Sequence, residues 1–141
     1  MISFKTWTLA TQPAPPTIAG PEAQAEWSRI EGTKSATDLE TFIRKFGDTD
    51  LGARAKVHVF EIRLNAAFAG DTSSMAFVAD LYASGQGVAQ NFDKALVWYK
   101  KSAEAGNDFG MLRLGQFYAA GRGAPQDFGK AREWFEKSAA L

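Results

Sequence analysis

The stretch LYASGQGVAQNFDKALVWYKKSA, residues 81–103, recurs 36 residues later as FYAAGRGAPQDFGKAREWFEKSA, residues 117–139. The two copies align without a gap. They are identical at Tyr82 and Tyr118, Gly85 and Gly121, Gly87 and Gly123, Gln90 and Gln126, Phe92 and Phe128, Lys94 and Lys130, Ala95 and Ala131, and Trp98 and Trp134. A fixed period of this length is typical of a helical repeat array, in which each repeat is one supersecondary unit.

Each copy is predicted to be a helix, a loop and a second helix. In the first copy a helix over residues 72–84, with Asp71 as its N-cap, carries an apolar stripe at helical spacing on Met75, Val78, Leu81 and Tyr82. Gly85 ends this helix, because a glycine can adopt the left-handed backbone that the last turn requires. Asn91 is expected to cap the second helix, as Asp127 does in the next copy.

The second helix of each copy places its largest side chains on one face. In the first copy these residues are Phe92, Ala95, Trp98, Tyr99 and Ser102. Ala79 and Gly115 provide small surfaces on the first helices, so the paired helices can approach closely. One hairpin cannot bury such a face alone, so neighbouring hairpins must stack on it. The repetition of Trp98 as Trp134 therefore indicates core residues, with ligand-binding aromatics as the alternative.

Residues 21–69 read as three less regular helices. Pro21 begins a helix to residue 31; a capping box from Thr37 to Glu40 opens a helix to residue 47; and Asp50 caps a helix over residues 51–69. Residues 65–70 lie 36 positions before residues 101–106 and look like the closing half of a degenerate repeat. The chain is thus predicted to be an all-α solenoid of antiparallel helix pairs with seven helices. It divides into a flexible Pro-rich arm (1–20), a helical module (21–69) and two repeats (70–106 and 107–141).

Composition excludes several classes of function. The 141 residues are 45% hydrophobic, enough for a buried core, and 16 basic residues balance 16 acidic ones. No net field therefore attracts nucleic acid, and we expect no nucleic-acid partner. No segment approaches the roughly 20 apolar residues that a membrane-spanning helix needs, and the N-terminus shows no export signal, so no membrane insertion is expected. A cytoplasmic location is favoured, with a periplasmic fragment of a longer protein as the alternative. Oligomeric state is not indicated.

Candidate chemistry is sparse. His58 is the only histidine and the chain has no cysteine, and one histidine cannot form a zinc site without cysteines or a cluster of carboxylates at ligand spacing. A structural role is favoured for His58 over that of a base or a ligand. Asp48, Asp50 and Gly52 resemble the opening of a calcium loop, but Val59 stands where the loop needs a glutamate. We therefore expect no catalytic residues, no metal and no cofactor, and the chain is predicted not to be an enzyme.

The repeated motif resembles the Sel-one-like repeat family, a relative of the tetratricopeptide repeat. The residues that carry the resemblance are the paired loop glycines, the K-A-x-x-W of Lys94–Trp98 and Lys130–Trp134, and the S-A-E-A-G of residues 102–106. The resemblance covers residues 70–141 and implies a stack of helix pairs that acts as an adaptor for other proteins, as bacterial family members do. The second copy reaches Leu141 before its closing glycine, so we expect a longer parent protein or an end that packs elsewhere.

A second resemblance concerns the module before the repeats. Its W-x-x-I at Trp27 and F-I-x-x-F-G-D at Phe42 are similar to a helical module of multidomain bacterial proteins, some with caspase-like domains. This keeps an alternative function open, a regulatory or substrate-recruiting domain of a larger enzyme.

A partner surface should differ between copies. The first helix of each pair lines the groove in related solenoids, and its positions off the apolar stripe carry Phe77 against Arg113 and Asp80 against Gln116. We predict that Phe77, Asp80, Arg113 and Gln116 face the groove and bind an extended or helical peptide of a protein partner. Solvated residues without a partner are the alternative.

Overall fold

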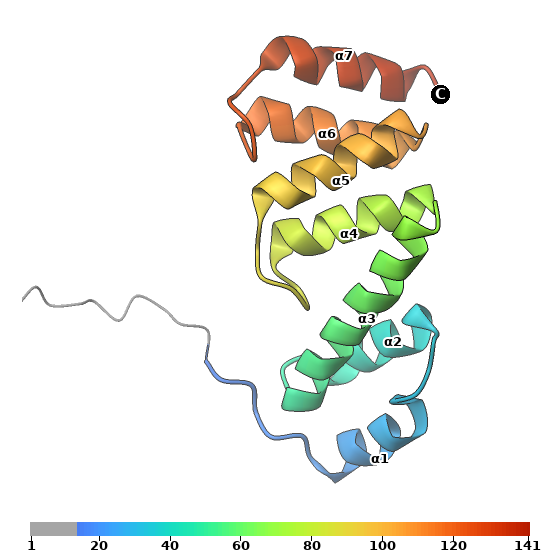
Figure 1. The fold of residues 1–141 in the computed structure, drawn as a ribbon. Coiled ribbons are helices and arrows are strands. Elements are labelled where there is room, and N and C mark those ends of the chain that lie inside the picture. Colours follow the sequence, from blue (N-terminus) through green and yellow to red (C-terminus); the bar gives the residue numbers. More distant parts are fainter. Residues whose placement is uncertain (1–13) are drawn as a thin grey trace, which may run out of the picture.

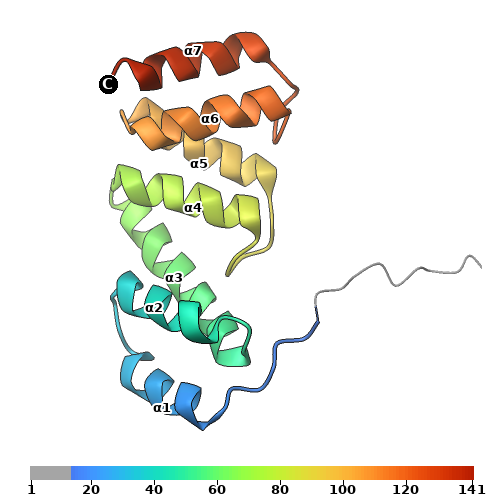
Figure 2. The same ribbon diagram turned by 180° about the vertical axis from the view of Figure 1, so that it is seen from behind.

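The computed structural model describes residues 14–141, which form seven α-helices and no strand. The helices are α1 (Pro21–Ile30), α2 (Ala36–Phe46), α3 (Asp50–Phe68), α4 (Thr72–Ser84), α5 (Phe92–Glu104), α6 (Asp108–Ala120) and α7 (Phe128–Ala139). Figure 1 shows them stacked in chain order, with α1 at one end of the molecule and α7 at the other, and Figure 2 shows the same order from behind. The predicted all-α solenoid of antiparallel helix pairs is confirmed.

Local hydrogen bonds begin and end the repeat helices as the sequence predicts. The side chains of Asp71, Asn91 and Asp127 each accept a hydrogen bond from a backbone N–H three residues later, at 2.9 Å in all three cases. Gly85 has a left-handed backbone, with φ of 73°, and its N–H donates to the carbonyl of Leu81. Gly121 repeats this geometry with φ of 64°.

Residues that recur at the 36-residue period make the same contacts in both repeats. The side-chain amides of Gln90 and Gln126 donate to the carbonyls of Ala83 and Ala119, both at 2.8 Å. The hydroxyls of Ser102 and Ser138 donate to the carbonyls of Thr72 and Asp108, at 2.8 and 3.2 Å. Lysine ammonium groups lie over the rings of Tyr82 and Tyr118, at 5.4 and 5.3 Å from the ring centroids. The repeated residues therefore serve the hairpin itself.

The loop glycines also let successive hairpins approach each other. Gly87 has a φ of 72°, and a Cβ atom there would collide with the carbonyl oxygen of Lys56 on α3. Gly123 is in the same position one repeat later, where a Cβ would collide with the carbonyl oxygen of Phe92. The second glycine of each G-x-G thus places the loop against the helix of the preceding unit.

The core consists of two clusters that share α3. One cluster runs from α3 to α7 and is centred on the fully buried Val78, Tyr99 and Leu114. The other joins α1, α2 and the first half of α3 through Trp27, Leu39 and Phe42.

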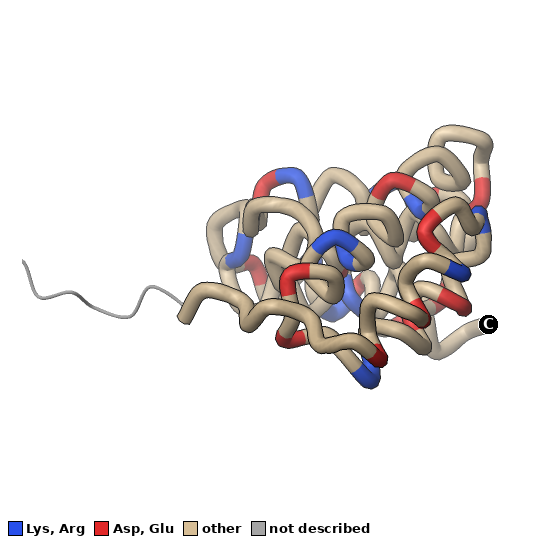
Figure 3. The backbone as a smooth tube through the Cα atoms, turned by 90° about the horizontal axis from the view of Figure 1, so that it is seen from below, with Lys and Arg blue, Asp and Glu red and all other residues tan. Residues whose placement is uncertain are grey.

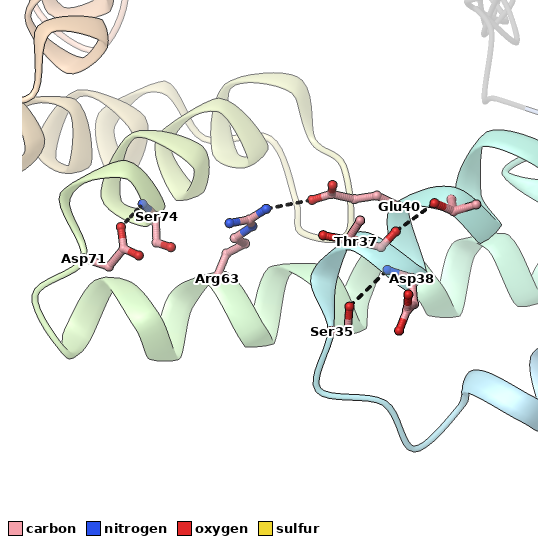
Figure 4. Close-up of polar contacts among 8 residues, drawn as sticks. Ser35, Thr37, Asp38, Glu40, Arg63, Asp71 and Ser74 are labelled. Atoms are coloured by element: carbon pink, nitrogen blue, oxygen red, sulfur yellow. Dashed lines mark hydrogen bonds and ion pairs between the residues drawn. The ribbon is translucent and has the colours of Figure 1, made fainter.

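Two predicted N-caps upstream are wrong by one or two residues. Ser35, with an extended backbone, caps α2 by accepting from the Asp38 N–H at 3.3 Å, so Thr37 lies inside the first turn (Figure 4). Thr49 caps α3 by accepting from the Gly52 N–H at 3.0 Å. The Asp50 carboxylate instead accepts a hydrogen bond from the Ala19 N–H at 2.8 Å.

The segment before α1 differs in part from the predicted flexible arm. Residues 1–13 lie outside the described residues. Thr17 pairs with the junction of α2 and α3, because its N–H donates to the Asp48 carbonyl at 3.1 Å and its carbonyl accepts from the Asp50 N–H at 3.0 Å. Ala19 is 4% exposed and belongs to the N-terminal core cluster. The end of the Pro-rich segment is thus held by backbone hydrogen bonds that its composition does not reveal.

Candidate functional site

Three of the four predicted partner-binding residues lie together where α4 meets α6. The Arg113 Nε lies 3.4 Å from Asp80 Oδ1, an ion-pair distance across the two helices. The Nη1 of Arg113 also donates to the Oε1 of Gln116, one turn further along α6, at 3.3 Å. About a third of each charged side chain is exposed, 40% for Arg113 and 31% for Asp80. The pair therefore lies at the surface and is held from both helices.

Tyr99, on α5, also belongs to this cluster. Its hydroxyl donates a hydrogen bond to Asp80, while its ring is buried against Phe117, with centroids 4.8 Å apart. Burial, then the hydrogen bond to Asp80 and the charge of Asp80, raise the pKa of Tyr99, against a smaller lowering by Arg113 and Arg122. Tyr99 therefore keeps its proton and holds Asp80 in place beneath Arg113.

Phe77 lies one turn before Asp80 on α4 but belongs to a neighbouring set of contacts. Its ring is 44% exposed and has the guanidinium of Arg63 4.4 Å from its centroid. Arg63, on α3, is paired in turn with Glu40 on α2, at 2.9 Å between Nη2 and Oε1 (Figure 4). Phe77 is thus an exposed aromatic residue in cation–π contact with Arg63, and the ion pair with Glu40 holds Arg63 in position.

There is one hollow on each side of this part of α4. The larger, ≈ 420 Å³, lies between α4 and α6 and is lined by residues that include Phe77, Asp80, Tyr99, Arg113 and Arg122. The smaller, ≈ 180 Å³, lies between α4 and the α2–α3 pair and is lined by residues that include Ile43, Val59, Phe77 and Leu81. Gln116 lines neither of them; it is exposed and accepts the hydrogen bond from Arg113.

Sequence reasoning missed Tyr99, Arg63 and Arg122 at this site. Tyr99 was assigned to the core by its apolar spacing, and its hydroxyl was overlooked although Phe135 stands at the same position in the next repeat. Arg122 occupies the position of Gln86 in the first repeat. The rule that selected Phe77 and Arg113, a difference between copies, would have found Arg122 had it been applied to the loop.

The rest of the described surface offers no comparable chemistry. His58 is half-buried and lies beside an open hollow of ≈ 480 Å³ between α1 and α3. Residues 14–141 hold no group of three or more His, Asp or Glu side chains placed to bind a metal. In the view of Figure 3, acidic and basic residues are interspersed along the helices and do not gather by sign. None of the helices in this range is both long and apolar enough to cross a membrane.

The Sel1 repeat family model matches residues 72–107 and 109–141. The C-terminal half of the chain is a pair of Sel1 repeats. Sel1-repeat proteins generally act as scaffolds for protein–protein interactions, and their fold is generally non-catalytic. The resemblance read from the loop glycines and the K-A-x-x-W motif is confirmed.

Solved structures extend the similarity beyond the two Sel1 repeats. A Sel1 repeat protein from Oxalobacter formigenes is 29% identical, with a TM-score of 0.60 over 94% of this chain and 94% of that one. Cysteine rich protein B of Helicobacter pylori, 24% identical, has a TM-score of 0.58 over 77% of this chain and 91% of its own. A protective antigen of uropathogenic Escherichia coli with an SLR fold, 23% identical, has a TM-score of 0.59 over 84% of this chain. This chain spans 29% of the antigen's length. The last two show the fold alone. No curated protein matches the chain.

Proposed function

We propose that this chain is a non-catalytic interaction module that binds a peptide segment along the surface of α4 and α6. The observation that supports this most directly is the exposed Phe77 beside the fixed Asp80–Arg113 pair. Phenylalanine and arginine are both enriched in protein interfaces relative to the rest of the protein surface. Contacts to Arg63, Tyr99 and Gln116 hold these side chains in place before binding, which lowers the entropy lost on association.

The packing of the helices supports the same surface. The first helices of the two repeats, α4 and α6, contact each other, whereas the second helices, α5 and α7, do not. A stack whose first helices are closer together curves toward them, so α4 and α6 form its inner side. A peptide lying on this side would contact both repeats at once.

The proposal is tested by selecting binders from a displayed library of random dodecapeptides on the immobilised chain. The affinities of the selected peptides are then measured by fluorescence anisotropy for the double variant Phe77→Ala/Arg113→Ala. We expect this variant to lose about tenfold or more in affinity, because it removes the aromatic and the cation of the site. Its melting temperature should change little, since both side chains are partly exposed.

The matched control is Phe128→Ala/Arg132→Ala on α7. It removes the same two residue types from positions where Phe128 is 67% exposed and the Arg132 side chain is 82% exposed, away from the α4–α6 surface. Its affinity should equal that of the unmodified chain. Equal losses in the two double variants, or none in either, would show that peptides bind elsewhere.

A further inference from the structure

The two hollows beside α4 are neighbours, and we call the pair the track. Both are lined by Phe77, Leu81 and Gln86, which lie along one side of α4 and in the loop that follows it. The smaller hollow opens toward α2 and α3 and the larger toward α6. A single extended segment crossing α4 would therefore place neighbouring side chains in both hollows.

The smaller hollow suits an uncharged apolar side chain. Ile43, Val59, Leu81 and the ring of Phe77 line it. Its charged members already have partners, because Glu40 is paired with Arg63 at 2.9 Å and the Lys56 ammonium donates to the Gly47 carbonyl at 2.8 Å. A charge placed there would lose water and gain no free partner, so burial of apolar surface is what this hollow can contribute.

The larger hollow carries an excess of positive charge. Its lining contains one carboxylate, Asp80, and two guanidinium groups, Arg113 and Arg122. Asp80 is already satisfied by the Tyr99 hydroxyl and by Arg113. Arg122 forms no ion pair within residues 14–141. The Nε of Arg113 is buried 3.4 Å from Asp80, so this nitrogen faces the carboxylate that Arg113 already has. A carboxylate brought between the two arginines would therefore pair chiefly with Arg122.

We propose that the track recognises a peptide in which an apolar side chain enters the hollow of Ile43, Val59 and Leu81 while a nearby acidic side chain binds between Arg113 and Arg122. This rests on the proposed function and specifies its ligand. The apolar side chain supplies buried area, and the carboxylate supplies charge-assisted hydrogen bonds and fixes the register of the peptide. Arg122 is the specificity-determining residue, because it is the one cation of the hollow without an acidic partner among the described residues.

The test uses the full chain and the dodecapeptides selected on it. We expect the selected peptides to share an apolar residue and a Glu or Asp at a constant spacing. Replacing the acidic residue by Gln, or the apolar residue by Ala, should each weaken binding about tenfold or more. Arg122→Gln should reproduce the loss caused by the Glu→Gln peptide and add nothing to it. Arg122→Glu should shift a new selection from acidic to basic residues. Arg132→Gln, an exposed arginine on α7, is the control and should leave binding unchanged.

The outcomes separate this proposal from the one before it. Peptides that depend on Phe77 but lack a shared acidic residue, or that bind Arg122→Gln with unchanged affinity, would overturn the acidic-peptide proposal and leave the groove as the binding surface. Peptides that are insensitive to both Phe77→Ala/Arg113→Ala and Arg122→Gln would overturn both. If Arg122→Gln and Arg132→Gln lowered the affinity for the peptides equally, the charge attraction would be non-specific, and this would also overturn the proposal.

Discussion

Tyr99 shows how one atom changes the use of a repeated position. It is 1% exposed and stands at the position of Phe135 in the next repeat, which is half-buried. The additional hydroxyl reaches Asp80 and fixes that carboxylate under Arg113. In the second repeat Phe135 has no hydroxyl and Gln116 replaces the acid, so the arrangement occurs once in the described part of the chain. The proposed binding surface therefore consists of residues that differ between the repeats at positions whose backbone the repeat already determines.

The first prediction concerns the variant Tyr99→Phe and its dependence on pH. The pKa of the Tyr99 hydroxyl is raised above its ordinary value of 10.0, so the folded state favours the protonated phenol. The stabilisation is fully present below about pH 10 and is lost as the pH rises above it, because the unfolded chain can then ionise. We expect Tyr99→Phe to lower the free energy of unfolding by about 1 kcal/mol at pH 7. This deficit should shrink above pH 10, as measured by urea denaturation of both proteins from pH 7 to 11.

A deficit that stays constant across this range would mean that the hydroxyl ionises as easily in the folded chain as in the unfolded one. Absorbance at 295 nm gives an independent check, because ionised tyrosine absorbs there. Tyr99 should contribute no change before the chain unfolds.

At single residues, the sequence predicted what depends on local backbone geometry. Asp71, Asn91 and Asp127 were identified as N-caps because each stands directly before the first residue of a helical pattern. Ser35 and Thr49 were missed because each is followed closely by a second residue able to cap, and backbone geometry decides between them. The hydroxyl of Tyr99 acts on α4, another element of the chain, so no local pattern indicates its role. Arg122 differs from Gln86 between the copies, but only the first helices were compared in this way.

At the scale of the helices, the equivalent residues Trp98 and Trp134 have different neighbours on the helix that precedes them. Trp98 is 8% exposed and packs edge-on against Phe68 of α3, with ring centroids 5.3 Å apart. Trp134 is only partly buried. For Trp134, the residue that corresponds to Phe68 is Glu104, which has no aromatic ring. Each indole has its own lysine over the ring, Lys101 at 4.5 Å from the centroid of Trp98 and Lys137 at 4.2 Å from that of Trp134. The cation–π contact therefore occurs in both repeats, whereas the aromatic neighbour occurs only at Trp98.

The second prediction follows from this difference. Trp98→Ala should lower the free energy of unfolding by about 3–5 kcal/mol, because it leaves a cavity between α3 and α5. Trp134→Ala should cost at least about 1 kcal/mol less, since water already reaches part of its ring. Urea denaturation followed by far-UV circular dichroism measures both. Equal costs would show that burial, which differs between the two indoles, does not determine their contribution.

The sequence predicted the order of the helices, but it predicted only some of the contacts at the junctions between them. The 36-residue period specified α4 to α7 and their loops, because both repeats use the same helix caps and the same loop contacts. The closing turn of α3 also follows the repeat: Gly70 donates to the Ala67 carbonyl at 3.1 Å as Gly106 does to that of Ala103 at 3.0 Å. The pairing of Thr17 with the α2–α3 junction has no counterpart in the repeats and joins residues 31 apart, so periodicity gave no indication of it.

Over the whole molecule, α3 connects two cores. Its first half contributes Leu51, Ala55 and Val59 to the cluster with α1 and α2. Its second half contributes Phe60, Leu64 and Ala67 to the cluster that continues to α7. Since α3 is one continuous helix of 19 residues, a disturbance in one core reaches the other only through this helix and the packing of α4.

The third prediction is that these two cores lose stability separately, and amide hydrogen exchange followed by mass spectrometry can detect it. Phe42 is fully buried in the N-terminal cluster and Leu114 is fully buried in the C-terminal one, so each can be replaced by alanine with a comparable cavity. Because a solenoid is stabilised by contacts between neighbouring units, Phe42→Ala should lower protection mainly in α1, α2 and the first half of α3, and Leu114→Ala mainly in α4 to α7. Each cost should be about 3–5 kcal/mol within its own cluster. The central turns of α3 should respond to both variants, since they border both cores. If either substitution lowered protection equally from α1 to α7, the molecule would unfold as a single unit, and α3 would be a rigid coupling between cores that cannot open independently.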